Sequence, residues 1–346
     1  MSGVQHLTVA EDEGEQRLDR WLRRRFPHVT QAMVEKLCRK GELRVDGGRV
    51  KAATRLESGQ SVRVPPLPDA PPPLPKPAAA PGIAPADARM IRDAVLWMDA
   101  HIIALDKPPG LPSQGGSGQG TRHVDALTEA LRFGYKDRPV LVHRLDRDTS
   151  GVMLLARTPR IARRLGEAFR ARTTRKIYWA IVAGVPSPAM GTIRYGLVKA
   201  GGPRSEKMRC LHPDQVAATE GAKRATTDYA VLARLGSRAA WVALVPVTGR
   251  THQLRAHMAE IGHPIVGDGK YGGSGQENPG DGWGAQLGGE ISRKLHLHAR
   301  SIRFEHPITG ESVTVTAPLP PHMAKSWAVF GWSETDVPAD PFEAEA

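Results

Sequence analysis

Cysteine is scarce in this chain of 346 residues, since Cys38 and Cys210 are the only two and lie far apart in the sequence. They form no Cys-x-x-Cys pair, so neither a disulfide framework nor a zinc site is expected. Aromatic residues make up 5% of the chain and hydrophobic residues 40%, as in a soluble globular protein. No apolar run approaches the ~20 residues of a membrane span, and the polar, acidic N-terminus is unlike a signal peptide. We therefore expect a cytoplasmic monomer with no membrane contact.

Acidic residues are also in deficit. The chain has 48 Lys and Arg against 36 Asp and Glu, which gives a formal net charge of +12. Such an excess favours a polyanionic partner, most often a nucleic acid. The charge is unevenly spread, because residues 16–51 hold eleven basic and four acidic side chains, whereas residues 333–346 hold five acids and no base. The latter segment is predicted to be a solvated, disordered acidic tail.

Residues 16–65 have the pattern of one small unit. Leu18, Trp21 and Leu22 share a helix face, and a second helix is expected between an N-cap at Thr30 and a glycine stop at Gly41. A hairpin follows around residues 46–48. The basic side chains of the two helices are predicted to contact RNA, and they are Arg17, Arg20, Arg23, Arg24, Lys36, Arg39 and Lys40. The alternative is a solvated basic surface with no ligand.

Residues 66–88 are predicted to be a linker, because residues 65–85 contain ten prolines and such a segment is extended and semi-rigid. Residues 89–332 then alternate strand and helix patterns. Helices are expected at 159–171, 252–261 and 321–331, and the strand patterns come largely in consecutive pairs. This order predicts an α+β domain built around a largely antiparallel, mixed sheet.

The run from His143 to Gly151 (HRLDRDTSG) carries the strongest chemical signal. It lies between two apolar, strand-like runs, and loops held between rigid strands are common sites of chemistry. Asp146 has an arginine on each side, and adjacent positive charge lets a carboxylate stay ionised when partly buried. The segment therefore suggests a carboxylate nucleophile or base that faces an anionic substrate. A salt-bridged polar β-turn is the alternative.

Two other sequence patterns give weaker indications of function. The glycine-rich run 115–120 fits neither Gly-x-Gly-x-x-Gly nor a phosphate-binding P-loop, so a connecting or RNA-facing loop is expected there, and residues 272–288 are expected to be a surface loop. A metal site is not predicted from the histidines, because positions i and i+5 of a helix lie about 140° apart. The histidines considered are His252, His257, His263, His296 and His298.

Three segments resemble the motifs of the RluA-type RNA pseudouridine synthases. The first is His-Arg-Leu-Asp-x-x-Thr-Ser-Gly at 143–151, the second is Lys-x-Tyr-x-Ala at 176–180, and the third runs from Val247 to Met258 and on to Gly267-Asp268. The resemblance covers roughly residues 90–330, and residues 16–65 separately resemble the S4-type RNA-binding module. A three-motif match in the family's order is far more specific than a single glycine pattern.

The resemblance implies an isomerase that converts uridine in RNA to pseudouridine without a cofactor or a metal. It identifies Asp146 as the catalytic aspartate, Arg255 as the arginine that pairs with it, and Tyr178 as the tyrosine that stacks on the target uracil. Arg144 is expected to fill the place that the flipped base leaves, and Arg147 and Arg250 to contact RNA. The module and the loop at 115–118 resemble the members that modify large-subunit ribosomal RNA.

Other functions remain open at this point. A non-catalytic RNA-binding or ribosome-assembly protein would account for the basic N-terminal unit but not for Asp146, Tyr178 and Arg255 together. A glycosidase-like hydrolase would need a pair of carboxylates, and Asp148 is the only acidic residue close to Asp146 in the sequence. Transfer RNA also remains possible as the substrate of a synthase.

Overall fold

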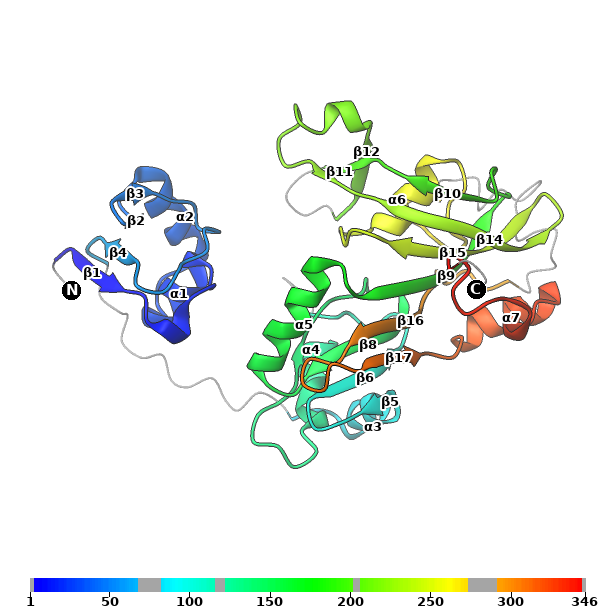
Figure 1. Cartoon of the computed structure of the whole chain (residues 1–346), viewed down its shortest axis with the longest axis horizontal. Coiled ribbons are helices and arrows are strands. Elements are labelled where there is room, and N and C mark those ends of the chain that lie inside the picture. Colours follow the sequence, from blue (N-terminus) through cyan, green and yellow to red (C-terminus); the bar gives the residue numbers. More distant parts are fainter. Residues whose placement is uncertain (1–2, 68–81, 116–121, 202–205, 273–290, 344–346) are drawn as a thin grey trace. The chain divides into compact units, whose positions relative to one another are not determined.

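The computed structural model describes residues 3–67, 82–115, 122–201, 206–272 and 291–343. The chain divides into two compact units, residues 1–82 and 83–346, which are described separately (Figure 1). Most of the proline-rich segment, residues 116–120 of the glycine-rich run and the loop at 273–288 lie outside the described residues. Within the described ranges, no helix has the length and apolar character needed to span a membrane.

The N-terminal unit packs two helices on a small antiparallel sheet. The helices are α1 (Leu18–Arg25) and α2 (Gln31–Lys40), preceded by a short 3-10 turn, η1 (Glu11–Glu13). The sheet has the order β1-β4-β2-β3, formed by Gln5–Thr8, Ser61–Val64, Arg44–Val45 and Gly48–Arg49. Because β1 pairs with β4 along its whole length, the unit begins before residue 16, where the sequence pattern placed its start.

Local sequence signals explain this unit. Leu18, Trp21 and Leu22 of α1 are fully buried in its core. The Thr30 side chain accepts a hydrogen bond from the Met33 amide and caps α2, and Gly41 ends that helix in the left-handed conformation, with a φ of 71°, which glycine adopts at little cost. All seven predicted RNA-contacting residues of the unit are exposed.

The second unit is built on a ten-stranded sheet with the order β10-β14-β15-β9-β16-β8-β6-β5, in which β17 pairs with β16 and β7 with β8. Of its strand pairs, β16–β8 is parallel and the others are antiparallel. The α+β prediction with a largely antiparallel, mixed sheet is therefore confirmed. The strands are β5 (Val95–Met98), β6 (Ile102–Lys107), β7 (Val140–Leu141), β8 (Ser150–Ala156), β9 (Arg175–Ala183), β10 (Met190–Ile193), β14 (Thr227–Leu235), β15 (Ala239–Pro246), β16 (Leu297–Glu305) and β17 (Ser312–Thr316).

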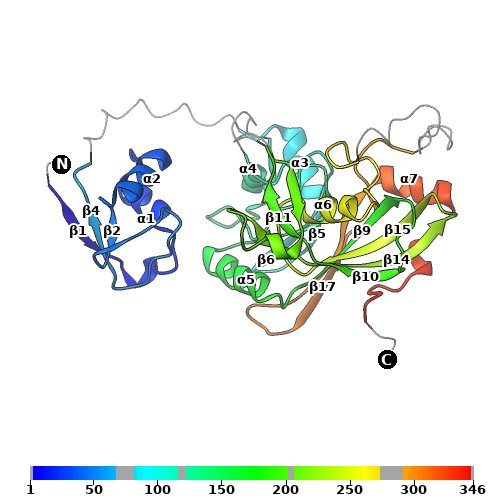
Figure 2. The same cartoon turned by 90° about the horizontal axis from the view of Figure 1, so that it is seen from above.

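Helices and a smaller sheet surround this large sheet (Figure 2). The helical elements are α3 (Pro85–Asp93), α4 (Val124–Leu127), η2 (Thr128–Leu131), α5 (Pro159–Ala171), α6 (Gln253–Glu260) and α7 (Pro321–Phe330). The smaller sheet joins β11 (Gly196–Lys199), β12 (Met208–Leu211) and β13 (Lys223–Arg224), with η3 (Pro213–Gln215) after β12. Helix α3 begins inside the segment predicted as linker, so the second unit starts at residue 83 rather than 89.

Gly151, the last residue of the HRLDRDTSG run, lies at the tight meeting of β8 and β16. Its φ is 105°, and a Cβ atom added there would lie 2.3 Å from the carbonyl oxygen of Ala299 on β16. Any other residue would clash with that backbone in a conformation that L-residues rarely adopt. Beside it, the Ser150 hydroxyl lies 2.9 Å from Nδ1 of buried His298. The end of the motif thus fixes where β8 joins the sheet.

The predicted disorder of residues 333–346 is wrong for residues 333–343. Residues Glu334–Asp336 form a short 3-10 turn, η5. Further on, the Asp340 carboxylate accepts two hydrogen bonds from the Arg175 guanidinium, at 2.7 and 2.8 Å, and Phe342 packs against the core that includes Trp327. The acidic composition suggested solvation, but the ion pair with Arg175 and the burial of Phe342 offset the cost of ordering the tail. Residues 344–346 lie outside the described residues.

Candidate active site

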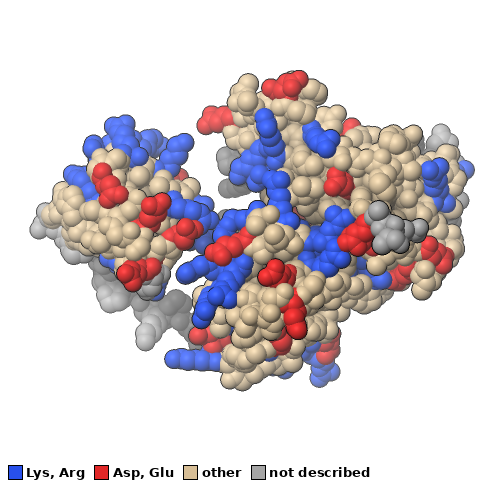
Figure 3. All heavy atoms as spheres, in the orientation of Figure 1, with Lys and Arg blue, Asp and Glu red and all other residues tan. Residues whose placement is uncertain are grey.

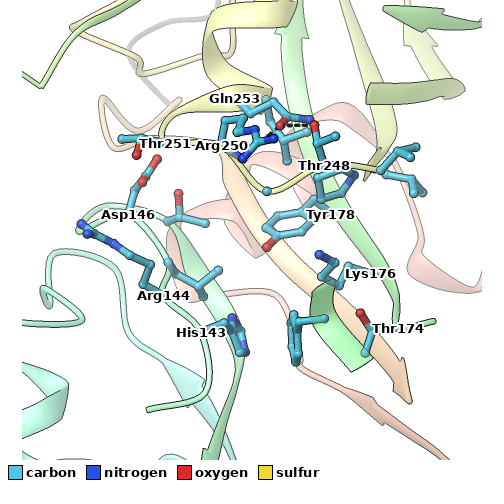
Figure 4. Close-up of a pocket in the computed structure, with 18 of the residues that line it drawn as sticks. His143, Arg144, Asp146, Thr174, Lys176, Tyr178, Thr248, Arg250, Thr251 and Gln253 are labelled. Carbon is cyan, nitrogen blue, oxygen red and sulfur yellow. Dashed lines mark hydrogen bonds between the residues drawn. The ribbon is translucent and has the colours of Figure 1, made fainter. Parts of the chain in front are cut away.

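A cavity of about 750 Å³ opens between three segments of the second unit. The first is the loop that carries His143 to Thr149, the second runs from the end of α5 into β9, and the third leads from the end of β15 into α6. Figure 4 shows Asp146 and Arg144 on one side of this space, and Tyr178 and Lys176 on the other. The three segments contain the three sequence motifs, so the fold brings motifs far apart in sequence to one place.

The backbone around Asp146 is held by two side chains, Lys107 at the end of β6 and Ser113 in the segment that follows. The Ser113 hydroxyl accepts a hydrogen bond from the Leu145 amide at 3.0 Å and donates to the Leu145 carbonyl at 2.6 Å. On the other side, Nζ of the fully buried Lys107 donates to the Arg147 carbonyl at 2.9 Å. The same ammonium group also donates to the carbonyls of Pro108 and Leu111. Both neighbours of Asp146 are therefore fixed, which preorganises its carboxylate.

Two groups from the third segment approach the Asp146 carboxylate. Arg255 Nη1 lies 3.7 Å from Asp146 Oδ2, and His252 Nε2 lies 3.9 Å from the same oxygen. The predicted pairing of Arg255 with Asp146 is thus an ion-pair contact. The direct hydrogen-bond partner of Arg255 is Asp268, whose two carboxylate oxygens accept from Nε and Nη2 at 2.7 Å each.

Tyr178 enters the cavity from β9, and its phenol ring points toward the space beside Asp146 (Figure 4). Burial raises the pKa of Tyr178 well above its ordinary value, and the negative charge of Asp146 raises it further. The phenol therefore stays protonated in the free protein. Lys176 lies two residues earlier on the same strand, and burial lowers its pKa. Its Nζ lies 5.3 Å from the centre of the Phe169 ring.

The arginines predicted to contact RNA near the site occupy different positions. Arg144 and Arg250 are exposed and line the cavity, and Arg250 Nε also donates to the Arg224 carbonyl at 3.3 Å. Arg147 does not line it; its exposed side chain lies against the Gly110 carbonyl and 3.9 Å from Asp148. We expect Arg147 to have less access to a base in the cavity than Arg144.

Positive charge dominates the walls of the cavity. Asp146 is the one acidic residue among its described lining residues, and Asp148 is not one of them. The basic lining residues are Arg144, Arg170, Arg172, Arg175, Lys176, Arg250 and Arg255. In Figure 3, Lys and Arg side chains gather on this face over α5 and beside the smaller sheet. One carboxylate among cations suits a phosphate-bearing substrate, and it does not supply the second carboxylate that a glycosidase needs.

The sequence reading missed several residues that build this site. The last turn of α5 and its C-cap contribute two exposed arginines that line the cavity, Arg170 and Arg172. The other missed residues form hydrogen bonds that hold site residues in place. They are Lys107, Ser113, Tyr271 and Asp268. Asp268 belongs to the third motif, so its residue type was visible there, but its bond to Arg255 depends on the tertiary structure.

The histidines considered as metal ligands have other partners. His257 Nδ1 lies 2.9 Å from the Thr227 hydroxyl, and His263 Nδ1 lies 2.9 Å from the Ala183 carbonyl. The Ser326 hydroxyl lies 2.8 Å from Nε2 of His296. The Ser150 hydroxyl lies 2.9 Å from Nδ1 of His298. Across the described part of the chain, no group of three or more His, Cys, Asp or Glu residues is placed to hold a metal ion.

Comparison with known proteins identifies the class. A family model described as RNA pseudouridylate synthase matches residues 101–260, and the S4 domain model matches residues 16–62. A solved human protein, RNA pseudouridylate synthase domain containing 4, is 30% identical and superimposes with a TM-score of 0.57 over 70% of this chain and 95% of that one. The chain belongs to the RNA pseudouridine synthase family, so it is an isomerase with an N-terminal S4 domain.

Two bacterial relatives align with this chain over more than nine-tenths of both sequences. The chain is 36% identical to ribosomal large subunit pseudouridine synthase C of Pasteurella multocida, over 93% of this chain and 92% of that protein. It is likewise 36% identical to the protein of that name from Haemophilus influenzae, over 92% of each. The similarity therefore extends through both units.

Proposed function

We propose that this pseudouridine synthase modifies uridines of large-subunit ribosomal RNA and that Asp146 is its nucleophile. The observation that supports this most is that Asp146 carries the one carboxylate among the described residues that line the cavity, where Tyr178 and seven basic residues also line the walls. The substrate part of the proposal comes from the names of the relatives that match along both units.

The reaction sets what the site must do. The bond between N1 of the uracil and C1′ of the ribose breaks, the base turns, and C5 bonds to C1′. A proton leaves C5 and N1 gains one, so atoms and electrons balance with no oxidant, no reductant and no co-substrate. Asp146 supplies the electron pair for the first attack, and two targets remain: C1′ of the ribose or the uracil ring. The base must first leave its stack to reach the cavity.

The neighbours of Asp146 suit this chemistry. The guanidinium of Arg255, 3.7 Å away, favours the ionised carboxylate that attack requires. Tyr178 offers a flat, half-buried ring beside Asp146 on which uracil can stack. Because burial and Asp146 raise the pKa of Tyr178, we propose that the phenol begins the reaction as a hydrogen-bond donor rather than as a base.

The exposed cations provide the RNA contacts. Arg144 lies at the mouth of the cavity next to Asp146, where its guanidinium can take the place of the extruded base in the RNA stack. Arg250 and the arginines at the end of α5 can neutralise phosphates on either side of the target nucleotide. The basic face of the N-terminal unit adds contacts that do not depend on the target base.

The experiment that tests the proposal compares RNA substrates. Large-subunit ribosomal RNA and bulk transfer RNA, both transcribed without modification, are incubated with the protein, and pseudouridine is mapped chemically. We expect site-specific pseudouridine in ribosomal RNA. Modification of transfer RNA alone would contradict the substrate proposal, and no modification of either RNA would favour a non-catalytic RNA-binding role.

A further inference from the structure

His252 has an unusual place next to the proposed nucleophile. It immediately precedes α6 with a φ of 51° and a ψ of 22°, the left-handed conformation, which costs a non-glycine residue free energy and persists where the surrounding structure enforces it. Its side chain is buried, and Nε2 lies 3.9 Å from Asp146 Oδ2. The backbone strain and the burial place one ring nitrogen against the carboxylate.

The other ring nitrogen of His252 lies 3.0 Å from the Tyr271 hydroxyl. That hydroxyl oxygen already accepts a hydrogen bond from the Met208 amide of β12, at 2.8 Å. Within the described residues, Nδ1 of His252 is the acceptor available for the Tyr271 hydroxyl hydrogen. A backbone group of the smaller sheet therefore fixes the tyrosine, and the tyrosine in turn faces the imidazole.

These contacts distinguish the two neutral tautomers of the His252 ring. If Nδ1 carried the hydrogen, the hydroxyl hydrogen of Tyr271 would lack that acceptor and the Nε2 lone pair would face the Asp146 carboxylate. If Nε2 carries the hydrogen, Nδ1 accepts from Tyr271, and the N–H group points at Asp146. The second arrangement gives the Tyr271 hydroxyl its acceptor and turns the donor of His252 toward an anion, and it is favoured because a buried polar group without a partner is costly.

We propose that His252 is a positioning residue for Asp146 and that Tyr271 holds it in the Nε2–H tautomer. The inference rests on the proposed role of Asp146 as nucleophile. The 3.9 Å separation is longer than a hydrogen bond, and such contacts often tighten when substrate binds. Arg255 and His252 both approach Oδ2, so they orient the carboxylate through that oxygen, and Oδ1 is the oxygen that attacks.

The charges around His252 are consistent with a neutral donor. Burial lowers its pKa, and the positive charges of Arg255 and Lys270 lower it further, whereas the carboxylates of Asp146 and Glu206 raise it. Burial is the largest of these effects, so the pKa lies below the ordinary value and the ring is neutral at neutral pH.

Long-range ¹H–¹⁵N NMR of the full-length protein tests the tautomer without reference to activity. The His252 resonances are assigned by their loss in His252→Asn. We expect the Nε2–H pattern at pH 7.5, and Tyr271→Phe should increase the share of the Nδ1–H form. An Nδ1–H tautomer or an imidazolium in the wild type would overturn the proposal. Because this readout needs no turnover, it can succeed or fail independently of the proposed substrate and nucleophile.

Variants test the consequence for catalysis. Asparagine tolerates the left-handed backbone but is too short to reach Asp146, so His252→Asn should fold normally and lower the single-turnover rate about 10- to 100-fold, as expected for a lost hydrogen bond to a charged group. His252→Gln supplies a longer N–H donor and should recover part of that rate. RNA affinity should change little in both.

A matched control uses a histidine of the same motif. His263 bonds to the Ala183 carbonyl and does not line the cavity, so His263→Gln should keep the wild-type rate. If His252→Asn is folded and as fast as the wild type, the positioning role is wrong. An equal loss in the Asn and Gln variants, with no change of tautomer in Tyr271→Phe, would overturn it as well.

Discussion

Arg255 is held by Asp268 in a buried, two-point ion pair, with both hydrogen bonds 2.7 Å long. Asp268 itself is fixed, because its Oδ1 also accepts from the backbone amides of Lys270 and Tyr271. The remaining Nη1 of Arg255 faces Asp146 at 3.7 Å. The orientation of the arginine toward the proposed nucleophile is therefore set by a second aspartate outside the cavity lining.

The first prediction concerns this second aspartate. Asp268→Asn keeps the shape of the side chain but removes the charge and one of the two acceptors of Arg255. We expect the single-turnover rate to fall about 10- to 100-fold, as for a lost hydrogen bond between charged groups, while RNA affinity is nearly kept. The control Asp228→Asn changes a carboxylate that bonds to Thr192 at the edge of the sheet and should be fully active. A wild-type rate in Asp268→Asn would mean that Arg255 needs no such orientation.

The second prediction concerns the glycine that ends the first motif. In Gly151→Ala the new Cβ would meet the Ala299 carbonyl oxygen at 2.3 Å, in a backbone with a φ of 105°. We expect a loss of about 3 kcal/mol or more in the free energy of unfolding, or failure to fold. Gly166→Ala in α5 is the control, since its Cβ meets an ordinary contact at 3.5 Å and alanine favours a helix by ~0.5–1 kcal/mol. Urea titrations of both variants measure the difference, and equal stability would contradict the packing described.

The third prediction concerns acid. Burial lowers the pKa of His257, His296 and His298 to about 4 each, from 6.5. The unfolded chain then binds more protons than the folded chain between these values. Stability from the neutral rings is complete above pH 6.5 and is lost as the pH falls toward 4, by at most about 3 kcal/mol per histidine. Unfolding titrations from pH 7.5 to 4.5 measure this loss.

A single variant isolates one of these histidines. His298 accepts from Ser150 and contacts the Ala317 carbonyl through Nε2, and glutamine can offer an acceptor and a donor without titrating. His298→Gln should lower stability at neutral pH and reduce the acid-dependent loss. If the free energy of unfolding falls with pH equally steeply in the variant and the wild type, His298 is not buried as a neutral group.

The fourth prediction concerns the N-terminal unit. Arg20, Arg23 and Arg24 are exposed on α1, and neutralised phosphates each add ~0.7–0.9 to the slope of log K against log salt. The triple alanine variant should therefore flatten that slope by up to about 2 to 3. Arg17 is already bound through two hydrogen bonds to Asp19, so Arg17→Ala should change the slope much less. Equal slopes in the triple variant and the wild type would show that this face is merely solvated.

Much of the fold could be predicted from local patterns. Helix α5 has the bounds predicted for it, 159–171, because apolar periodicity and capping residues are local signals. The short strands β1 and β10–β13 were not predicted, since two to four residues carry little periodicity. The order of the tail was missed because its ion pair joins Asp340 to Arg175, far away in the sequence.

The candidate site, like the fold, could be predicted from the sequence only in part. Asp146, Tyr178 and Arg255 were identified by the resemblance of their segments to the family's motifs, and the cavity brings these three residues together. The residues that hold them in place could not be identified from the sequence. The hydrogen bonds of Lys107 and Ser113 to the backbone beside Asp146, and those between Arg255 and Asp268, exist only in the tertiary structure. His252 was considered as a metal ligand, and its position between Tyr271 and Asp146 could be recognised only from the fold.

The most direct test of the account is a single-turnover assay of Asp146→Asn on large-subunit ribosomal RNA. The amide keeps the shape of the side chain but cannot act as an anionic nucleophile. We expect no pseudouridine and nearly wild-type RNA affinity, with mass spectrometry showing that the asparagine has not deamidated. Asp148→Asn, two residues away and exposed, should retain full activity. Near-wild-type pseudouridine formation by Asp146→Asn would contradict the central claim that Asp146 is the nucleophile.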